Sequence, residues 1–137
     1  NYYAEALVGL GRFEEAVFAA QQGLAQSIED GSPENMGGAW RALGLVTART
    51  GETITIKDRA TGDSVEHDAR TCFAKSEKIF AEAEIHGERA RTLREWARYE
   101  LKAGNQERAV QMWQEARGIY AKLGADKEVQ RMENFPV

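Results

Sequence analysis

The stretch WRALG at residues 40–44 decides the fold, because it belongs to a helical-hairpin motif that the chain repeats. Gly51 closes this helix, and a second helix carries ARTCFAKS at residues 69–76. The second signature returns as AVQMWQEA at residues 109–116 and, weakened, as AVFAAQQG at residues 16–23. Small residues allow helices to cross closely, and glycine allows a helix to end in the left-handed conformation. The pattern therefore predicts paired helices.

A single period accounts for the spacing of these motifs. Gly11 and Gly51 are 40 residues apart, as are Ala69 and Ala109, whereas Gly51 and Gly104 are 53 residues apart. A 40-residue repeat with one 13-residue insertion in its second unit explains these intervals. Repeats of this length indicate stacked helical units rather than one globular core.

We predict an all-α domain over residues 1–137, made of helical hairpins with one inserted β-hairpin. Its parts are an incomplete repeat 1 (1–31), repeat 2 (32–87, with the insertion at 52–67), repeat 3 (88–124) and a terminal helix (125–137). After a first helix that ends at Gly11, helices are expected at about 13–28, 34–49, 67–86, 88–103, 106–123 and 126–134. Caps are expected at Ser32, Asn105 and Asp126, and a helix stop at Gly124.

The insertion has the alternating pattern of strands. TITIK at residues 53–57 and SVE at residues 64–66 alternate polar and apolar side chains around a turn that contains Gly62. Two strands alone are rarely stable in water, so we expect the hairpin to pack against the helices. Three roles stay open: decoration, a cap over one end of a groove, or an edge for self-association.

Composition excludes several classes of protein. A net charge of −4 and a pI near 5.3 argue against nucleic-acid binding. The single cysteine, Cys72, forms no internal disulfide, and no Cys/His spacing suggests a metal site. No apolar run has the length of a membrane span. We expect a cytoplasmic protein, and because Asn1 opens inside a helical pattern, we expect a piece of a longer one.

Trp-x2-Leu-Gly followed by Ala-x3-aromatic resembles the tetratricopeptide repeat over nearly the whole chain. The resemblance implies an α–α superhelix whose first helices line a concave face for peptides. The period exceeds the usual length of about 34 residues, which leaves armadillo and HEAT repeats as the alternative. The long second helices look like the repeat tails of large bacterial signalling proteins.

This resemblance implies a protein–protein interaction module of an intracellular bacterial signalling or regulatory protein, without enzymatic activity or a cofactor. The alternative is a structural or oligomerisation segment that binds no separate ligand. Self-association through the hairpin or an open end of the repeats belongs to that alternative.

A basic strip is the candidate ligand site. Basic residues recur at spacings of 3, 4 and 4 along the helix expected at 88–103, on one helical face. Two more arginines lie on the preceding first helix. Like charges four residues apart cost about 0.2–0.5 kcal/mol per pair, so an acidic peptide would suit them. The strip comprises Arg41, Arg49, Arg91, Arg94, Arg98 and Lys102.

A solvated face, paired internally with Glu95, Glu88 and Glu100, is the other interpretation of these charges. The asparagines of the carboxylate clamp that holds chaperone tails are missing, with Ala42 and Leu45 in the corresponding stretch.

Catalytic signatures are weak. Cys72 is expected to pack beside Phe73, while His67 and His86 lie near opposite ends of one helix and are too far apart to act together along it. The chain has no phosphate-binding glycine loop and no HExxH motif. The expected core is Leu7, Leu10, Ala16, Leu24, Trp40, Leu43, Gly44, Phe73, Phe80, Leu93, Trp96, Ala97, Ala109, Trp113 and Ala116.

Overall fold

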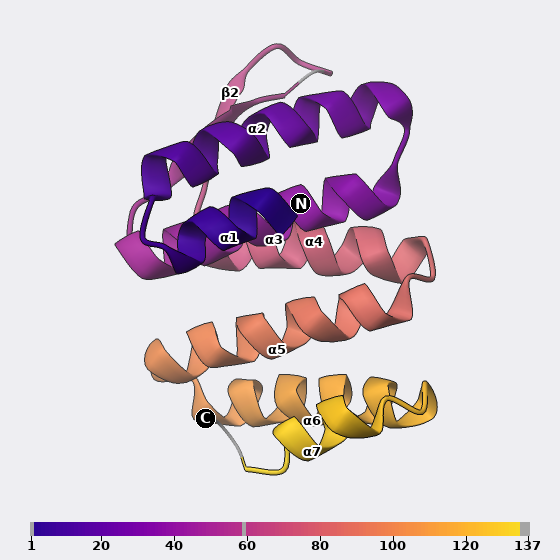
Figure 1. Ribbon diagram of the computed structural model, residues 1–137. Coiled ribbons are helices and arrows are strands. Elements are labelled where there is room, and N and C mark those ends of the chain that lie inside the picture. The colour runs from indigo at the N-terminus through magenta and orange to yellow at the C-terminus, as the bar shows by residue number, and fades with distance from the viewer. Residues whose placement is uncertain (1, 59, 135–137) are drawn as a thin grey trace. The chain divides into compact units, whose positions relative to one another are not determined.

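The computed structural model describes residues 2–58 and 60–134, and in these ranges it contains seven helices and one two-stranded sheet (Figure 1). The predicted all-α fold with an inserted β-hairpin is confirmed. Asn1, Arg59 of the predicted turn and residues 135–137 of the predicted terminal segment lie outside the described residues. The elements are α1 (Tyr2–Gly9), α2 (Phe13–Asp30), α3 (Pro33–Thr50), β1 (Ile54–Lys57), β2 (Ser64–His67), α4 (Ala69–Glu82), α5 (His86–Lys102), α6 (Gln106–Lys122) and α7 (Asp126–Arg131).

Two compact units make up the chain, Asn1–Ile79 and Phe80–Val137. In the first unit, α1, α2 and α3 pack against one another, and the hairpin lies beside α2 (Figure 1). In the second unit, α5 packs along α6, and α7 packs on α6. The division falls inside α4.

The same short turn joins consecutive helices at five places in the described ranges. Each turn contains a residue with positive φ, and the N–H of the next residue donates to the carbonyl five positions back, as at Asn105 and Glu100 (2.8 Å). This is the Schellman arrangement, which satisfies carbonyls that a helix end would leave unpaired. The residues with positive φ are Gly11, Gly31, Glu84, Gly104 and Gly124.

The end of α3 differs from the others. Gly51 also has positive φ (74°), but its N–H donates to Thr47 and the chain then runs out into β1. At the start of the same helix, Ser32 accepts from the N–H of Asn35 and Pro33 occupies the first turn, as the sequence predicts.

The hairpin depends on the helical core, as expected for two strands alone. β1 and β2 are antiparallel, with Ile54 opposite His67 and Ile56 opposite Val65. Ile54 is buried in the core cluster that also contains Leu24, and Ile56 packs against that cluster.

Close approach between α3 and α4 explains the sequence signature that identified them. A Cβ atom built on Gly44 would lie 2.9 Å from ring atoms of Phe73. One turn later on α4, the Ser76 hydroxyl donates to the carbonyl of Gly37 (2.8 Å). The glycine and the serine are therefore small because the two helices touch there.

The helix predicted at 67–86 was too long at both ends. His67 belongs to β2, and Asp68 accepts the N–H of Thr71 just before α4 begins. At the other end, Glu84 has φ 58° and the chain turns into α5, which begins at His86 rather than Glu88.

One predicted cap is in place and one was wrong. Asn105 stands at the N-cap of α6 as predicted, but its side chain donates to Glu100 (2.8 Å) and makes no cap bond. Asp126 is the first residue of α7, and Ala125 stands at the N-cap.

The predicted core is confirmed with one exception. Leu10 is 70% exposed, because α1 ends at Gly9 and Leu10 lies in the following turn. The other residues of the predicted set are buried.

We expect Gly44→Ala to destabilise the protein by about 1–3 kcal/mol, because the new methyl group would overlap Phe73. Inside an unobstructed helix the same change should stabilise, by up to about 1 kcal/mol. Gly118 on α6 is the matched control, since a Cβ there meets no atom within 4 Å. Urea unfolding followed by circular dichroism measures both, and equal gains at the two positions would contradict the close packing.

Glu84→Gly should raise the free energy of unfolding by about 1 kcal/mol, because glycine adopts positive φ without the Cβ penalty. On regular helical backbone, the control Gln114→Gly should cost about 1 kcal/mol. A loss of stability in Glu84→Gly, measured by the same unfolding experiment, would contradict the positive φ at Glu84.

Candidate functional site

Arg41, predicted to line a groove, is buried inside the first unit. Its side chain is 1% exposed, and its guanidinium donates to both carboxylate oxygens of Glu5 at 3.2 and 3.1 Å. This two-pronged ion pair joins α3 to α1 inside the first unit. Both ends of the pair lie away from solvent, so Arg41 is unavailable to a peptide ligand.

Two arginines of α5 are engaged inside the second unit. Arg94 donates to Glu128 of α7 at 2.6 Å, and its guanidinium lies 5.6 Å from the centre of the Tyr120 ring. Arg98 donates to Glu95 at 2.6 Å and lies 5.6 Å from the centre of the Trp113 ring. These contacts favour the internally paired interpretation of the strip.

The remaining members of the strip do not form a cluster in either unit. Arg49 is exposed in the last turn of α3, Lys102 is exposed at the end of α5, and Arg91 is half-buried on α5. Glu100, expected on the solvated face, is instead fully buried and accepts from the Trp96 indole (2.9 Å).

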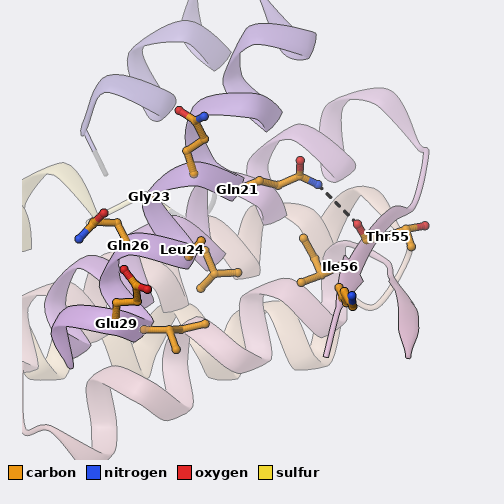
Figure 2. A pocket seen from close by; sticks show the side chains of 11 residues that line it. Gln21, Gly23, Leu24, Gln26, Glu29, Thr55 and Ile56 are labelled. Carbon is orange, nitrogen blue, oxygen red and sulfur yellow. Dashed lines mark hydrogen bonds between the residues drawn. The ribbon is translucent and has the colours of Figure 1, made fainter. Parts of the chain in front are cut away.

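An open groove of about 970 Å³ lies between α2 and β1 in the first unit (Figure 2). Leu24 of α2 and Ile56 of β1 point toward one another at its base (Figure 2). The side chain of Gln21 reaches across and donates to the carbonyl of Thr55 at 3.5 Å (Figure 2). Because this bond is long, a better donor could replace it.

The register of the hairpin explains why the Thr55 carbonyl faces α2. Just beyond the strands, the N–H of Asp58 donates to the carbonyl of Asp63 (2.7 Å), so these two residues form a pair that is hydrogen-bonded across the hairpin. In an antiparallel pair, residues alternate between bonding to the partner strand and pointing away from it. Thr55 and Lys57 therefore turn their backbone groups outward, along the edge of β1 that borders the groove.

Glutamine side chains form the opposite wall. Gln21, Gln22 and Gln26 of α2 line the groove, and each amide can donate and accept hydrogen bonds. A strand edge, an amide wall and an apolar base together suit an extended polypeptide. The sequence pattern did not point to these residues, and its only signal was three glutamines within six positions of an amphipathic helix.

Cys72 is a packing residue. It is fully buried in the core cluster, and this burial is the main cause that raises the pKa of its thiol to about 12. At neutral pH the side chain is therefore a protonated thiol rather than the thiolate that acts as a nucleophile. Within the described residues, no three His, Cys, Asp or Glu side chains come together as metal ligands.

His67 lies buried at the end of β2, where its ring and the Trp40 ring meet at 72° with their centres 5.0 Å apart. Its Nδ1 atom has no hydrogen-bond partner among the described residues. Burial lowers the pKa of this imidazole, and the charge of Lys75 lowers it further, while Asp68 opposes the change. His67 is therefore held neutral where an exposed histidine would begin to protonate.

This arrangement predicts that acid weakens the fold. Below pH 6.5 the unfolded chain takes up a proton that folded His67 resists, so the free energy of unfolding should fall as pH decreases from 7.5 to 5.5. The slope due to this one group is at most about 1.4 kcal/mol per pH unit. His67→Gln should remove it, whereas His86→Gln, at an exposed position, should keep it. Urea titrations across this range measure the slopes, and an unchanged slope in His67→Gln would contradict the assignment.

Comparison of the chain with protein-family models, curated proteins and solved structures gave no match. No helix within residues 2–58 and 60–134 combines the length and the apolar character needed to cross a bilayer.

Proposed function

We propose that this chain is a non-enzymatic protein-interaction module that binds an extended peptide in the groove between α2 and β1. The observation that carries the proposal is the outward edge of β1, with Thr55 and Lys57, facing the glutamines of α2 across an apolar base. A peptide strand could pair with this edge while its side chains contact α2.

The repeated turn supports a scaffold role. Short hairpins joined in the same way resemble tetratricopeptide repeats, and such repeats stack into superhelices that present binding surfaces. On this proposal the β-hairpin adds a strand edge to the helical hairpin of the first unit. The parent is a cytoplasmic bacterial signalling or regulatory protein, and binding requires no cofactor.

An acidic peptide held by the basic strip is the less favoured partner. Arg41 is buried against Glu5, and Arg94 and Arg98 are paired with Glu128 and Glu95. Binding there would have to break these contacts, whereas the edge of β1 offers backbone groups that point away from β2.

Thr55→Pro tests the proposal, because proline removes the outward N–H of β1 without removing a bond to β2. Glu66→Pro is the matched control, since Glu66 faces Thr55 across the sheet and loses the same group on the other edge. Peptides selected from a random library against the wild-type chain should bind Glu66→Pro as tightly as the wild type and Thr55→Pro about tenfold more weakly.

Amide NMR shifts on peptide addition should centre on Thr55, Lys57 and Gln21. Failure to select any binder, or equal binding by the two proline variants, would contradict the groove as the site. A dimer that dissociates in Thr55→Pro, detected by light scattering, would instead support the structural or oligomerisation alternative.

A further inference from the structure

A second surface lies on the other side of α2, where it meets α1. Tyr3 and Leu7 of α1 and Phe18 and Ala19 of α2 line a hollow of about 520 Å³. Leu7 is buried at 3% exposure, whereas Tyr3 and Phe18 are 67% and 62% exposed. The hollow therefore has a buried apolar base with large exposed apolar side chains beside it, which is unusual on a protein surface without a partner.

The shape of this hollow suits a helix. Tyr3 and Leu7 are four residues apart on α1, and Glu14, Phe18 and Gln22 follow the same spacing on α2. Residues at this spacing lie along one face of a helix, so two packed helices present two parallel stripes. A third helix can lay its apolar face between such stripes.

Charge identifies the chemistry of that helix. Residues 13–40 contain five acidic residues and no lysine or arginine, and residues 1–31 contain five acidic residues and one basic residue. Since the whole chain has 22 acidic and 18 basic residues, its net charge of −4 comes from the first 31 residues. Glu14 and Glu15 are the charged residues lining the hollow, and only Glu15 has a cation beside it, Arg12 at 2.7 Å.

We propose that the α1–α2 hollow, defined by Tyr3, Leu7, Phe18 and Ala19 with Glu14 and Glu15, binds a basic amphipathic helix of a partner protein. Its apolar residues cover Phe18 and Leu7, and its lysine or arginine residues face Glu14 and Glu15. This surface shares Gln22 with the groove beside β1, but none of its six defining residues lines that groove, and it does not depend on peptide binding there.

The probe is a peptide of about 15 residues in which leucine and lysine follow the helical period, so that one face is apolar and the other basic. It should bind the full chain in a fluorescence anisotropy titration, and the affinity should fall as salt is added. A leucine–glutamate peptide of the same pattern and a scrambled leucine–lysine peptide should bind about tenfold more weakly or not at all. Equal binding of the scrambled peptide would overturn the proposal.

Variants locate the binding surface. Phe18→Ser should weaken the leucine–lysine peptide by about tenfold, because the exposed ring is lost without opening the core. Leu123→Ser is the control, since Leu123 is a similarly exposed leucine at the end of α6. Glu14→Gln should weaken binding and reduce its salt dependence. Equal effects of Phe18→Ser and Leu123→Ser would overturn the assignment to this hollow.

Two further readouts separate the alternatives. Thr55→Pro should leave binding of this peptide unchanged, so failure of the β1 groove and failure of this surface are distinguishable. Light scattering without peptide should show a monomer. A dimer that Phe18→Ser dissociates would mean that a second copy of the chain covers the hollow, and that result would overturn the proposed partner.

Discussion

The turn between helices is the constraint on which the rest of this structure depends. A residue with positive φ ends the helix, and the next N–H bonds back to a carbonyl near the helix end, as in the pair Ile85 and Phe80 at 2.9 Å. The chain therefore reverses within two or three residues, and inside each unit the consecutive helices have little freedom except to pair. Burial of the facing side chains then adds the stability that a short isolated helix lacks.

At the end of α3, where this turn is absent, the chain does not reverse into another helix. The N–H of Gly51 donates to the carbonyl of Thr47, and the backbone that follows forms β1 instead of reversing. The inserted strands then take a place beside α2, which leaves α2 with the β1 edge on one side and α1 on the other. The groove beside β1 therefore follows from the inserted strands, whereas the α1–α2 hollow is lined by α1 and α2 alone.

Sequence periodicity predicted the helices because glycine at a helix end is a local signal. It also predicted the close approach of α3 and α4, since Gly44 and Phe73 stand at repeat positions. It missed the turn at Glu84, because a glutamate carries no mark of positive φ.

The binding residues were harder to predict, because a basic residue on a helix face looks the same whether it meets solvent or a buried carboxylate. Arg41 matched the pattern of a groove residue, but in the folded chain it is buried against Glu5. The open edge of β1 depends on strand register, which a pattern of alternating residues does not specify. Amide hydrogen exchange tests the repeated turn most directly, because the N–H groups at a helix start ordinarily lack partners and exchange quickly. The amides of Arg12, Ser32, Ile85, Asn105 and Ala125 should be protected, while those of the next two residues exchange fast, except after Ser32, where Pro33 has no N–H and only Glu34 reports. Fast exchange at Ile85 and Asn105 would contradict the account.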